Sequence, residues 1–187
     1  RIIGGWQIQS RASIGGNLCN SSPAADSIPA LIALGATCHI AGPSGRRTVP
    51  VEQFCTAPGK NVLARGELLT MLEFAAAKKT DGSHYLRFIP RNEMDIAVVG
   101  AASWLQLNAA GDKIEAARIA VGEVAPTPKF AEAASQSLVG QAPTEATFAK
   151  AGELAKQVAT PISDMRGTAE YRNCIERVDI LTSTLGK

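Results

Sequence analysis

The sequence has little of the features that would assign a function at once. Of its 187 residues, 19% are charged and 5% are aromatic, and it has only 2 histidines and 4 cysteines. The formal net charge is +2 and no basic block occurs, so neither nucleic acid nor an anionic membrane is indicated as a partner. With 45% hydrophobic residues, the chain can bury a core, and we do not expect disorder.

The cysteines are too dispersed to form a metal site by themselves. They are Cys19, Cys38, Cys55 and Cys174. None approaches the C-x-x-C spacing of zinc or iron–sulfur sites, and only two histidines are available to complete such a site. We therefore predict no metal site. The cysteines are interpreted as small buried residues with free thiols, which favours a reducing compartment such as the cytoplasm.

No hydrophobic run is long enough to cross a membrane. The most apolar stretch, residues 28–41, is interrupted by Pro29 and His39 and is shorter than the roughly 20 residues that a spanning helix needs. We therefore expect no transmembrane segment. The chain opens with Arg1 rather than Met and has no signal-like core, so we expect a fragment or a processed product.

The first five residues, RIIGG, imitate the start of an activated trypsin-like protease. That chemistry needs a nucleophilic serine in a Gly-Asp-Ser-Gly-Gly setting and a histidine base. The sequence has no such serine motif, and neither His39 nor His84 lies in a matching context. The protease interpretation is therefore rejected.

Turn residues and short apolar runs fill the first third of the chain. We predict a short helix through Leu34, with the Asp26 carboxylate as its N-cap and Gly35 at its end. Further predicted elements are a hairpin, formed by residues 36–41 and 46–51 around a Gly-Pro-Ser-Gly turn, and a strand over residues 68–74. Paired glycines in this region indicate positive φ angles or tight reversals.

A polar connector over residues 75–83 divides the chain. It contains three alanines and two lysines, followed by the turn residues Thr80-Asp81-Gly82-Ser83. We place a domain boundary here, with one domain over residues 1–78 and a second over residues 79–187.

The second domain is predicted to be α+β. An antiparallel three-stranded meander is expected from residues 85–89, 96–107 and 114–122, although propensity alone would also allow a helix for the alanine-rich middle run. Helices are expected over residues 128–138, along the apolar stripe from Phe148 to Val158, and along a second stripe from Tyr171 to Leu185 with Thr168 as N-cap. Strands followed by helices indicate an α+β fold rather than alternating βαβ units.

Ser13-Ile14-Gly15-Gly16-Asn17 is a candidate binding motif. Two adjacent glycines let a backbone approach a diphosphate or flavin closely enough for N–H donation, and Ser13 and Asn17 add side-chain hydrogen bonds. From the pentapeptide alone, an ordinary turn is the favoured interpretation. Neither the Rossmann nor the Walker glycine pattern occurs.

Further motifs occur along the whole chain in a recognisable order. They are Gln7-Ile8, Arg11, Ser13-Ile14-Gly15-Gly16-Asn17-Leu18, Ser22-Pro23-Ala24-Ala25-Asp26, Pro29-Ala30-Leu31, Gly66-Glu67-Leu68-Leu69, Met94-Asp95-Ile96-Ala97, Pro126-Thr127-Pro128 and Arg166-Gly167-Thr168-Ala169-Glu170-Tyr171-Arg172. In this order they resemble the FAD-binding medium subunit of molybdenum hydroxylases, the family of aerobic carbon monoxide dehydrogenase and xanthine dehydrogenase.

The resemblance implies an α+β architecture: the second subdomain of a PCMH-type FAD-binding domain, then a C-terminal domain like that of the carbon monoxide dehydrogenase flavoprotein. It implies that FAD is the cofactor and is lined by Ser13, Ile14, Gly15, Gly16 and Asn17. It also implies that Asp26 faces the cofactor, that Leu69 provides a backbone contact, and that Arg87 is a basic residue that is lysine in some members. Two alternatives stay open, namely that Asp26 is only an N-cap and Arg87 only a solvated strand residue.

The resemblance further implies an oxidoreductase subunit that passes electrons from iron–sulfur clusters to FAD and an external acceptor, with no catalytic acid, base or nucleophile of its own. The implied partners are a molybdopterin-binding large subunit and a 2Fe-2S small subunit. The family's upstream Ala-Gly-Gly-Thr type loop is missing here, so we expect half of the FAD cleft and little bound FAD on this chain alone. The alternative is a non-catalytic docking fragment that packs on partner subunits without FAD.

Overall fold

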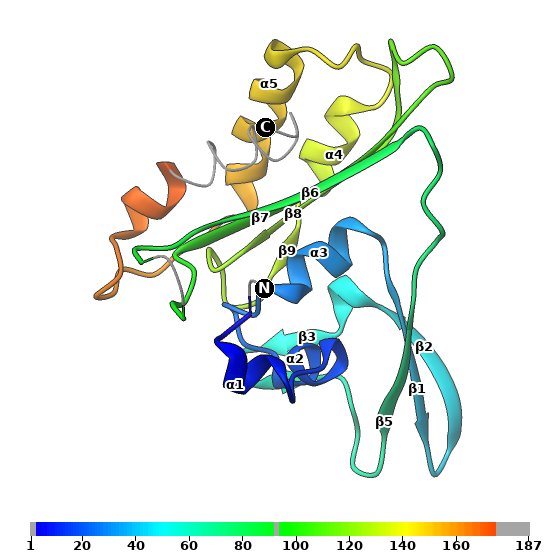
Figure 1. The fold of residues 1–187 in the computed structure, drawn as a ribbon, viewed down its shortest axis with the longest axis vertical. Coiled ribbons are helices and arrows are strands. Elements are labelled where there is room, and N and C mark those ends of the chain that lie inside the picture. Colours follow the sequence, from blue (N-terminus) through cyan, green and yellow to red (C-terminus); the bar gives the residue numbers. More distant parts are fainter. Residues whose placement is uncertain (1–2, 92–93, 175–187) are drawn as a thin grey trace.

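A four-stranded antiparallel sheet crosses the middle of the molecule (Figure 1). The structure is a computed structural model that describes residues 3–91 and 94–174. The strands of this sheet are β6 (Asp81–Phe88), β7 (Val99–Leu107), β8 (Ile114–Gly122) and β9 (Lys129–Phe130). The predicted meander is confirmed, with residues 108–112 in the turn between β7 and β8, but the sheet has a fourth strand that the sequence did not predict.

Strand β9 changes the start of the next helix. Phe130 pairs with Ala120 of β8, so the backbone at residues 129–130 is extended. The helix expected over residues 128–138 therefore begins only at Glu132, as α4 (Glu132–Leu138). Here a tertiary contact with the sheet overrides the local helical preference.

One face of the four-stranded sheet packs against α4 and α5 (Glu145–Ala155). The Thr144 side chain accepts a hydrogen bond from the Thr147 N–H at 3.3 Å and so caps α5. Phe148, Ala151 and Ala155 form the buried stripe of this helix, which confirms the helix predicted there. A short 3-10 turn, Lys156–Val158, follows directly.

The other face of the same sheet packs against α3 (Ser27–Ala33), which precedes it by some 50 residues in the sequence. Ile28 and Ile32 of α3 share one core with Ala102 of β7 and Ala120 of β8. Residues from before and after the connector that precedes β6 are therefore buried in the same apolar core. We propose that the polypeptide is organised as domains over residues 1–78 and 79–187 that share this core.

Of the two predictions for the ends of α3, the one for its start is wrong and the one for its end is confirmed. At its start, the Asp26 side chain makes no capping hydrogen bond, so the predicted cap is wrong. The carboxylate is instead engaged by Arg87, and a charged partner binds it more strongly than a backbone N–H would. At its end the prediction holds, because Gly35 has φ +63° and the Ala36 N–H donates to the Leu31 carbonyl at 3.0 Å.

A smaller three-stranded sheet lies beside α2 and α3 in the N-terminal part. Its strand order is β2-β1-β5, with β1 (Thr37–Gly42), β2 (Gly45–Pro50) and β5 (Leu68–Glu73). The predicted hairpin and the predicted strand over residues 68–74 are both confirmed. The sequence did not predict α1 (Trp6–Gln9), α2 (Ile14–Asn20), the 3-10 turn Val51–Gln53, or the short pair β3 (Cys55–Ala57) and β4 (Lys60–Asn61).

All four cysteines lie among the described residues, and each is a free thiol. Cys38 is fully buried, whereas Cys174 is exposed, so the interpretation of every cysteine as a buried apolar residue is wrong for Cys174. Within residues 3–91 and 94–174, no helix is long and apolar enough to span a membrane. In the same residues, no cluster of three His, Cys, Asp or Glu side chains is placed to hold a metal ion.

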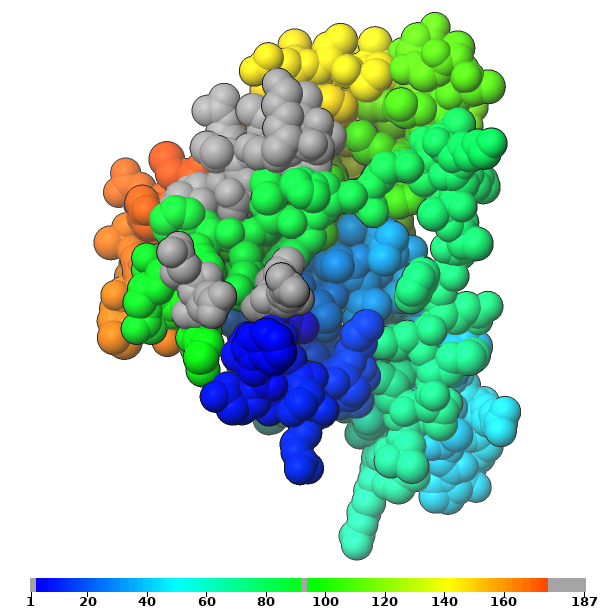
Figure 2. All heavy atoms as spheres, in the orientation of Figure 1, coloured from blue at the N-terminus to red at the C-terminus, as the bar shows by residue number. Residues whose placement is uncertain are grey.

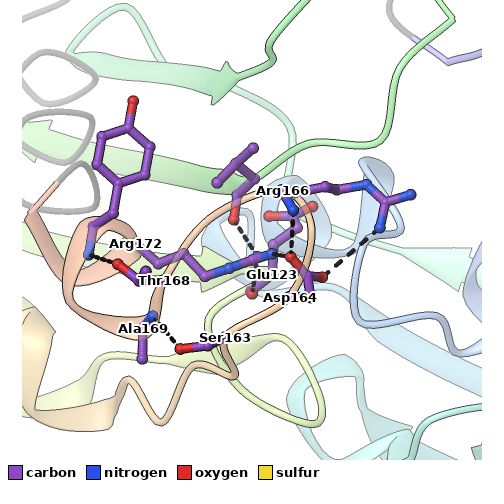
Figure 3. Close-up of polar contacts among 9 residues, drawn as sticks. Glu123, Ser163, Asp164, Arg166, Thr168, Ala169 and Arg172 are labelled. Atoms are coloured by element: carbon purple, nitrogen blue, oxygen red, sulfur yellow. Dashed lines mark hydrogen bonds and ion pairs between the residues drawn. The ribbon is translucent and has the colours of Figure 1, made fainter.

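A buried arginine ties the last described segment to the four-stranded sheet (Figure 3). Arg172 is 4% exposed, and its Nη1 donates to the carbonyls of Val98 at 2.8 Å and Glu123 at 3.2 Å. Its Nη2 donates to Asp164 Oδ1 at 2.7 Å. Glu123 has a left-handed backbone with φ +66°, so Arg172 stabilises a conformation that is unfavourable for a residue with a Cβ.

The helical segment that contains Arg172 begins after Thr168. The Thr168 hydroxyl accepts a hydrogen bond from the Tyr171 N–H at 3.2 Å, which confirms the predicted N-cap. The remainder of the predicted stripe, from residue 175 to Leu185, lies outside the described residues.

A glycine in β8 explains how closely α3 approaches the sheet. Gly100 of β7 pairs with Gly122 of β8. A Cβ at Gly122 would lie 2.9 Å from Cγ of Pro29 in α3, which is closer than real Cβ contacts allow. The absence of a side chain at Gly122 is therefore a condition for the packing of α3 on the sheet.

We predict that Gly122→Ala destabilises the protein by roughly 1–3 kcal/mol, because the methyl group would overpack a rigid contact. Urea unfolding measures this change. The matched control is Gly82→Ala in β6, where a Cβ meets nothing within 4 Å. Equal stabilities of the two variants would contradict the packing argument.

We also predict that Arg172→Met lowers the free energy of unfolding by about 3 kcal/mol, because it leaves buried carbonyls and a carboxylate without their donor. The control is Arg166→Met, since Arg166 is part-exposed and lies 3.7 Å from Asp164. That exposed pair should contribute less than about 1 kcal/mol. Similar losses for both variants in chemical denaturation would refute a special role for Arg172.

Candidate functional site

The motif Ser13–Asn17 forms the start of α2 rather than a free turn. The Ser13 hydroxyl accepts a hydrogen bond from the Gly16 N–H at 3.0 Å and caps the helix. Neither Gly15 nor Gly16 has a positive φ, so the expected reversal at this glycine pair is wrong. A Cβ at Gly16 would lie 2.9 Å from Ser13 Oγ, so this glycine leaves room for the cap.

Asn17 joins α2 to the beginning of α3. Its Oδ1 accepts hydrogen bonds from the Ser27 hydroxyl at 2.5 Å and from the Ser27 N–H at 3.3 Å. Ser27 directly follows Asp26. The end of the predicted binding motif is thereby held beside the predicted cofactor-facing carboxylate.

The Asp26 carboxylate forms an ion pair with Arg87 of β6. Arg87 Nη1 lies 3.0 Å from Asp26 Oδ1, and the two side chains are 12% and 13% exposed. Tyr85 lies two residues before Arg87 on the same strand, hence on the same face of the sheet, and its hydroxyl donates to the same Oδ1 at 3.3 Å. Asp26 is therefore more than an N-cap and Arg87 more than a solvated residue, so both alternative interpretations are wrong.

Tyr85 keeps its proton at physiological pH. Burial raises the pKa of its phenol far above the usual value, and the nearby carboxylates of Glu123 and Asp26 raise this pKa further, because each disfavours a second negative charge. The hydroxyl is therefore a permanent hydrogen-bond donor to Asp26.

Two hollows flank the first turn of α2. A hollow of about 300 Å³ between α2 and β5 is lined by Ile14, Gly15 and Leu69, together with Leu31, Thr70, Met71, Leu72 and Phe74. A larger, open hollow of about 640 Å³ is lined on the other side by Arg11, Ser13, Gly16 and Asn17, among others. Figure 2 shows this N-terminal segment, in blue, on the surface of the molecule beside the blue-green region that contains β5.

The structure thus brings the predicted residues together in two groups. Ile14, Gly15 and Leu69 share the smaller hollow, and Asp26 and Arg87 form the ion pair. The hydrogen bonds between Asn17 and Ser27 connect the groups, and Ser13 and Gly16 face the larger hollow. Tyr85 was not predicted from the sequence, although its spacing of two residues from Arg87 in a predicted strand places both on one face.

The strand that carries Leu69 is fixed by a salt bridge just before it. Glu67 accepts two hydrogen bonds from Arg47, from Nε at 2.8 Å and from Nη2 at 2.7 Å, and a third from the Ala64 N–H at 2.7 Å. The bonds from Arg47 and the Ala64 N–H lower the pKa of Glu67 from 4.5 to about 2. The loop before β5 is thereby tied to the β1–β2 hairpin.

Comparison with known proteins shows the family of this chain. The family model for the "CO dehydrogenase flavoprotein C-terminal domain" matches residues 84–178, and the model for the "FAD binding domain in molybdopterin dehydrogenase" matches residues 1–74. The chain belongs to this family of FAD-binding flavoproteins. The resemblance found from the ordered motifs is confirmed, as are the α+β fold and FAD as the family's cofactor.

Curated relatives are similar over most of this chain. The carbon monoxide dehydrogenase medium chain of Afipia carboxidovorans is 36% identical over 172 residues, and a putative xanthine dehydrogenase FAD-binding subunit of Escherichia coli K12 is 33% identical over 171. Both alignments cover 91% of this chain and 58% of the relative. A solved structure, reconstituted CO dehydrogenase from Oligotropha carboxidovorans, matches with a TM-score of 0.92 and 33% identity over 98% of this chain and 63% of the other.

The residues of the site fit parts of FAD. The smaller hollow has apolar walls from Ile14 and Leu69, which suit a flat aromatic ring. A Cβ at Gly15 would meet only Leu69 Cδ2, at 3.8 Å, so the glycine keeps this hollow open. Arg87 supplies a guanidinium and Asp26 an acceptor, the kind of polar groups that orient a ligand with ring carbonyls and hydroxyls.

We predict that the Glu67 salt bridge stabilises the fold in a pH-dependent way. Because the folded-state pKa of Glu67 lies below its ordinary value of 4.5, the stabilisation is present above that pH and is lost as pH falls toward 2. In thermal unfolding, Glu67→Gln should be less stable than the wild type at pH 7, and the difference should shrink toward pH 3. Glu115→Gln, an exposed site on β8, is the control. A pH-independent difference for Glu67→Gln would contradict this account.

Proposed function

We propose that this chain is the FAD-binding, electron-transfer part of a molybdenum-containing hydroxylase or dehydrogenase. The observation that supports this most directly is the Asp26–Arg87 ion pair beside the Ser13–Asn17 segment, in a chain of the FAD-binding family. When bound, FAD supplies the ring that accepts electrons and releases them to an acceptor. The electrons would come from iron–sulfur clusters and leave to an external acceptor.

The proposed partners are a molybdopterin-binding large subunit and a 2Fe-2S small subunit, and the proposed location is the cytoplasm. Support for the partners comes from the similar proteins, which include a carbon monoxide dehydrogenase medium chain and a xanthine dehydrogenase FAD-binding subunit. The free thiols at all four cysteines support a reducing compartment.

This chain's own residues would bind and orient the cofactor. We propose that Ser13, Ile14, Gly15, Gly16 and Asn17 line the cofactor, that Leu69 closes the apolar hollow, and that Asp26 and Arg87 fix the cofactor's polar groups. No residue is assigned as general acid, general base or nucleophile, because electron transfer through a bound flavin needs orientation and electrostatics from the protein.

We expect Gly15→Val to weaken FAD binding at least about tenfold, because its branched side chain fills the hollow between α2 and β5. FAD fluorescence titration of the complete natural polypeptide that contains this chain measures the dissociation constant. The matched control is Gly82→Val, which lies on an exposed strand position with open space around it. It should leave the affinity within about twofold.

Two outcomes would contradict the proposal. If a folded Gly15→Val protein binds FAD with unchanged affinity, the hollow between α2 and β5 is not part of the binding site. A wild-type polypeptide that binds its partner subunits but no FAD would favour the alternative function, a docking unit without cofactor.

A further inference from the structure

Tyr85 and Arg87 both hold one oxygen of Asp26. The Tyr85 hydroxyl and the Arg87 guanidinium donate to Oδ1, at 3.3 and 3.0 Å. From the residues that the structure describes, no donor reaches Oδ2. A carboxylate held through one oxygen by two donors from the same strand has a fixed orientation, and its second oxygen keeps its acceptor capacity.

We propose that Tyr85 is a positioning residue of the flavin site, which acts through Asp26 by fixing its carboxylate so that Oδ2 accepts a hydrogen bond from an N–H or O–H group of FAD. This inference rests on the proposed function and deepens it. Tyr85 itself makes no contact with the cofactor in this account.

The surroundings of Tyr85 hold its hydroxyl in place. Its ring packs against the core shared by α3 and the four-stranded sheet. Gly100 pairs with Arg87 in the neighbouring strand, and a Cβ there would lie 2.9 Å from the Tyr85 hydroxyl and 2.6 Å from Glu123 Oε2. The missing side chain at Gly100 therefore provides the space that the hydroxyl occupies.

The far side of this space is fixed by the buried arginine in Figure 3. Arg172 donates to the Glu123 carbonyl, and Glu123 directly follows Gly122, the cross-strand neighbour of Gly100. Arg172 thus contributes to the proposed flavin site without belonging to it. Arg172 fixes the backbone of Glu123, whose carboxylate and Gly100 together border the Tyr85 hydroxyl.

The test is a double-mutant cycle with Tyr85→Phe and Asp26→Asn, in the complete natural polypeptide stripped of cofactor and titrated with FAD. Tyr85→Phe removes one oxygen and keeps the ring. We expect it to weaken FAD binding roughly tenfold, which is typical for loss of a hydrogen bond to a charged group. Asp26→Asn should weaken binding at least as much. If Tyr85 acts through Asp26, the double variant should bind FAD no more weakly than Asp26→Asn alone, within about twofold.

Two further measurements separate positioning from a general structural role. The visible absorption spectrum of bound flavin should shift in Tyr85→Phe, whereas the thermal midpoint of the cofactor-free protein should change little. Tyr171→Phe is the matched control, because Tyr171 is 47% exposed and its ring contacts only Phe88 among the aromatic residues described. It should alter neither the affinity nor the spectrum.

The outcomes distinguish this inference from the proposed function. If Asp26→Asn weakens FAD binding and Tyr85→Phe does not, or if the two effects simply add, the positioning role is overturned while the site stands. If Asp26→Asn leaves FAD affinity unchanged, the site itself is misplaced, and both proposals fail.

Discussion

The ion pair between Asp26 and Arg87 joins residues 61 positions apart, and much of the molecule serves to bring them together. Both side chains are largely removed from water, so each charge needs its partner. Asp26 stands at the start of α3, and Arg87 stands on β6 of the four-stranded sheet. The packing of α3 on that sheet is therefore the condition for the proposed flavin site, whose residues come from both parts of the chain.

That packing combines small residues of the sheet with large apolar residues of α3. Gly122 leaves room for Pro29 where α3 approaches, and Ala102 and Ala120 of the same sheet belong to the shared core. The shared core thus joins close backbone approach at Gly122 with large apolar side chains such as Ile28 and Ile32. Gly100, the cross-strand neighbour of Gly122, provides the space for the Tyr85 hydroxyl.

Turn residues and hydrophobic periodicity predicted the elements that depend on neighbouring residues in the sequence. The hairpin around its Gly-Pro-Ser-Gly turn, the meander and the Thr144-capped α5 follow from turn chemistry and periodicity. The wrong predictions have tertiary causes. Residues 129–130 form β9 because they pair with β8, and the Asp26 carboxylate binds Arg87 instead of capping α3. The candidate residues came from the resemblance of ordered motifs, whereas Tyr85 required knowledge of which strand face meets α3.

The central claim is that α2, α3 and β6 together form one FAD site. A crystal structure of the complete natural polypeptide with FAD tests it most directly. The account predicts the flavin against Gly15 and Leu69, with a polar group of FAD within hydrogen-bond distance of Asp26 Oδ2 and with Tyr85 and Arg87 still bound to Oδ1. FAD bound away from these residues, or an Asp26–Arg87 pair that faces no part of the cofactor, would contradict it.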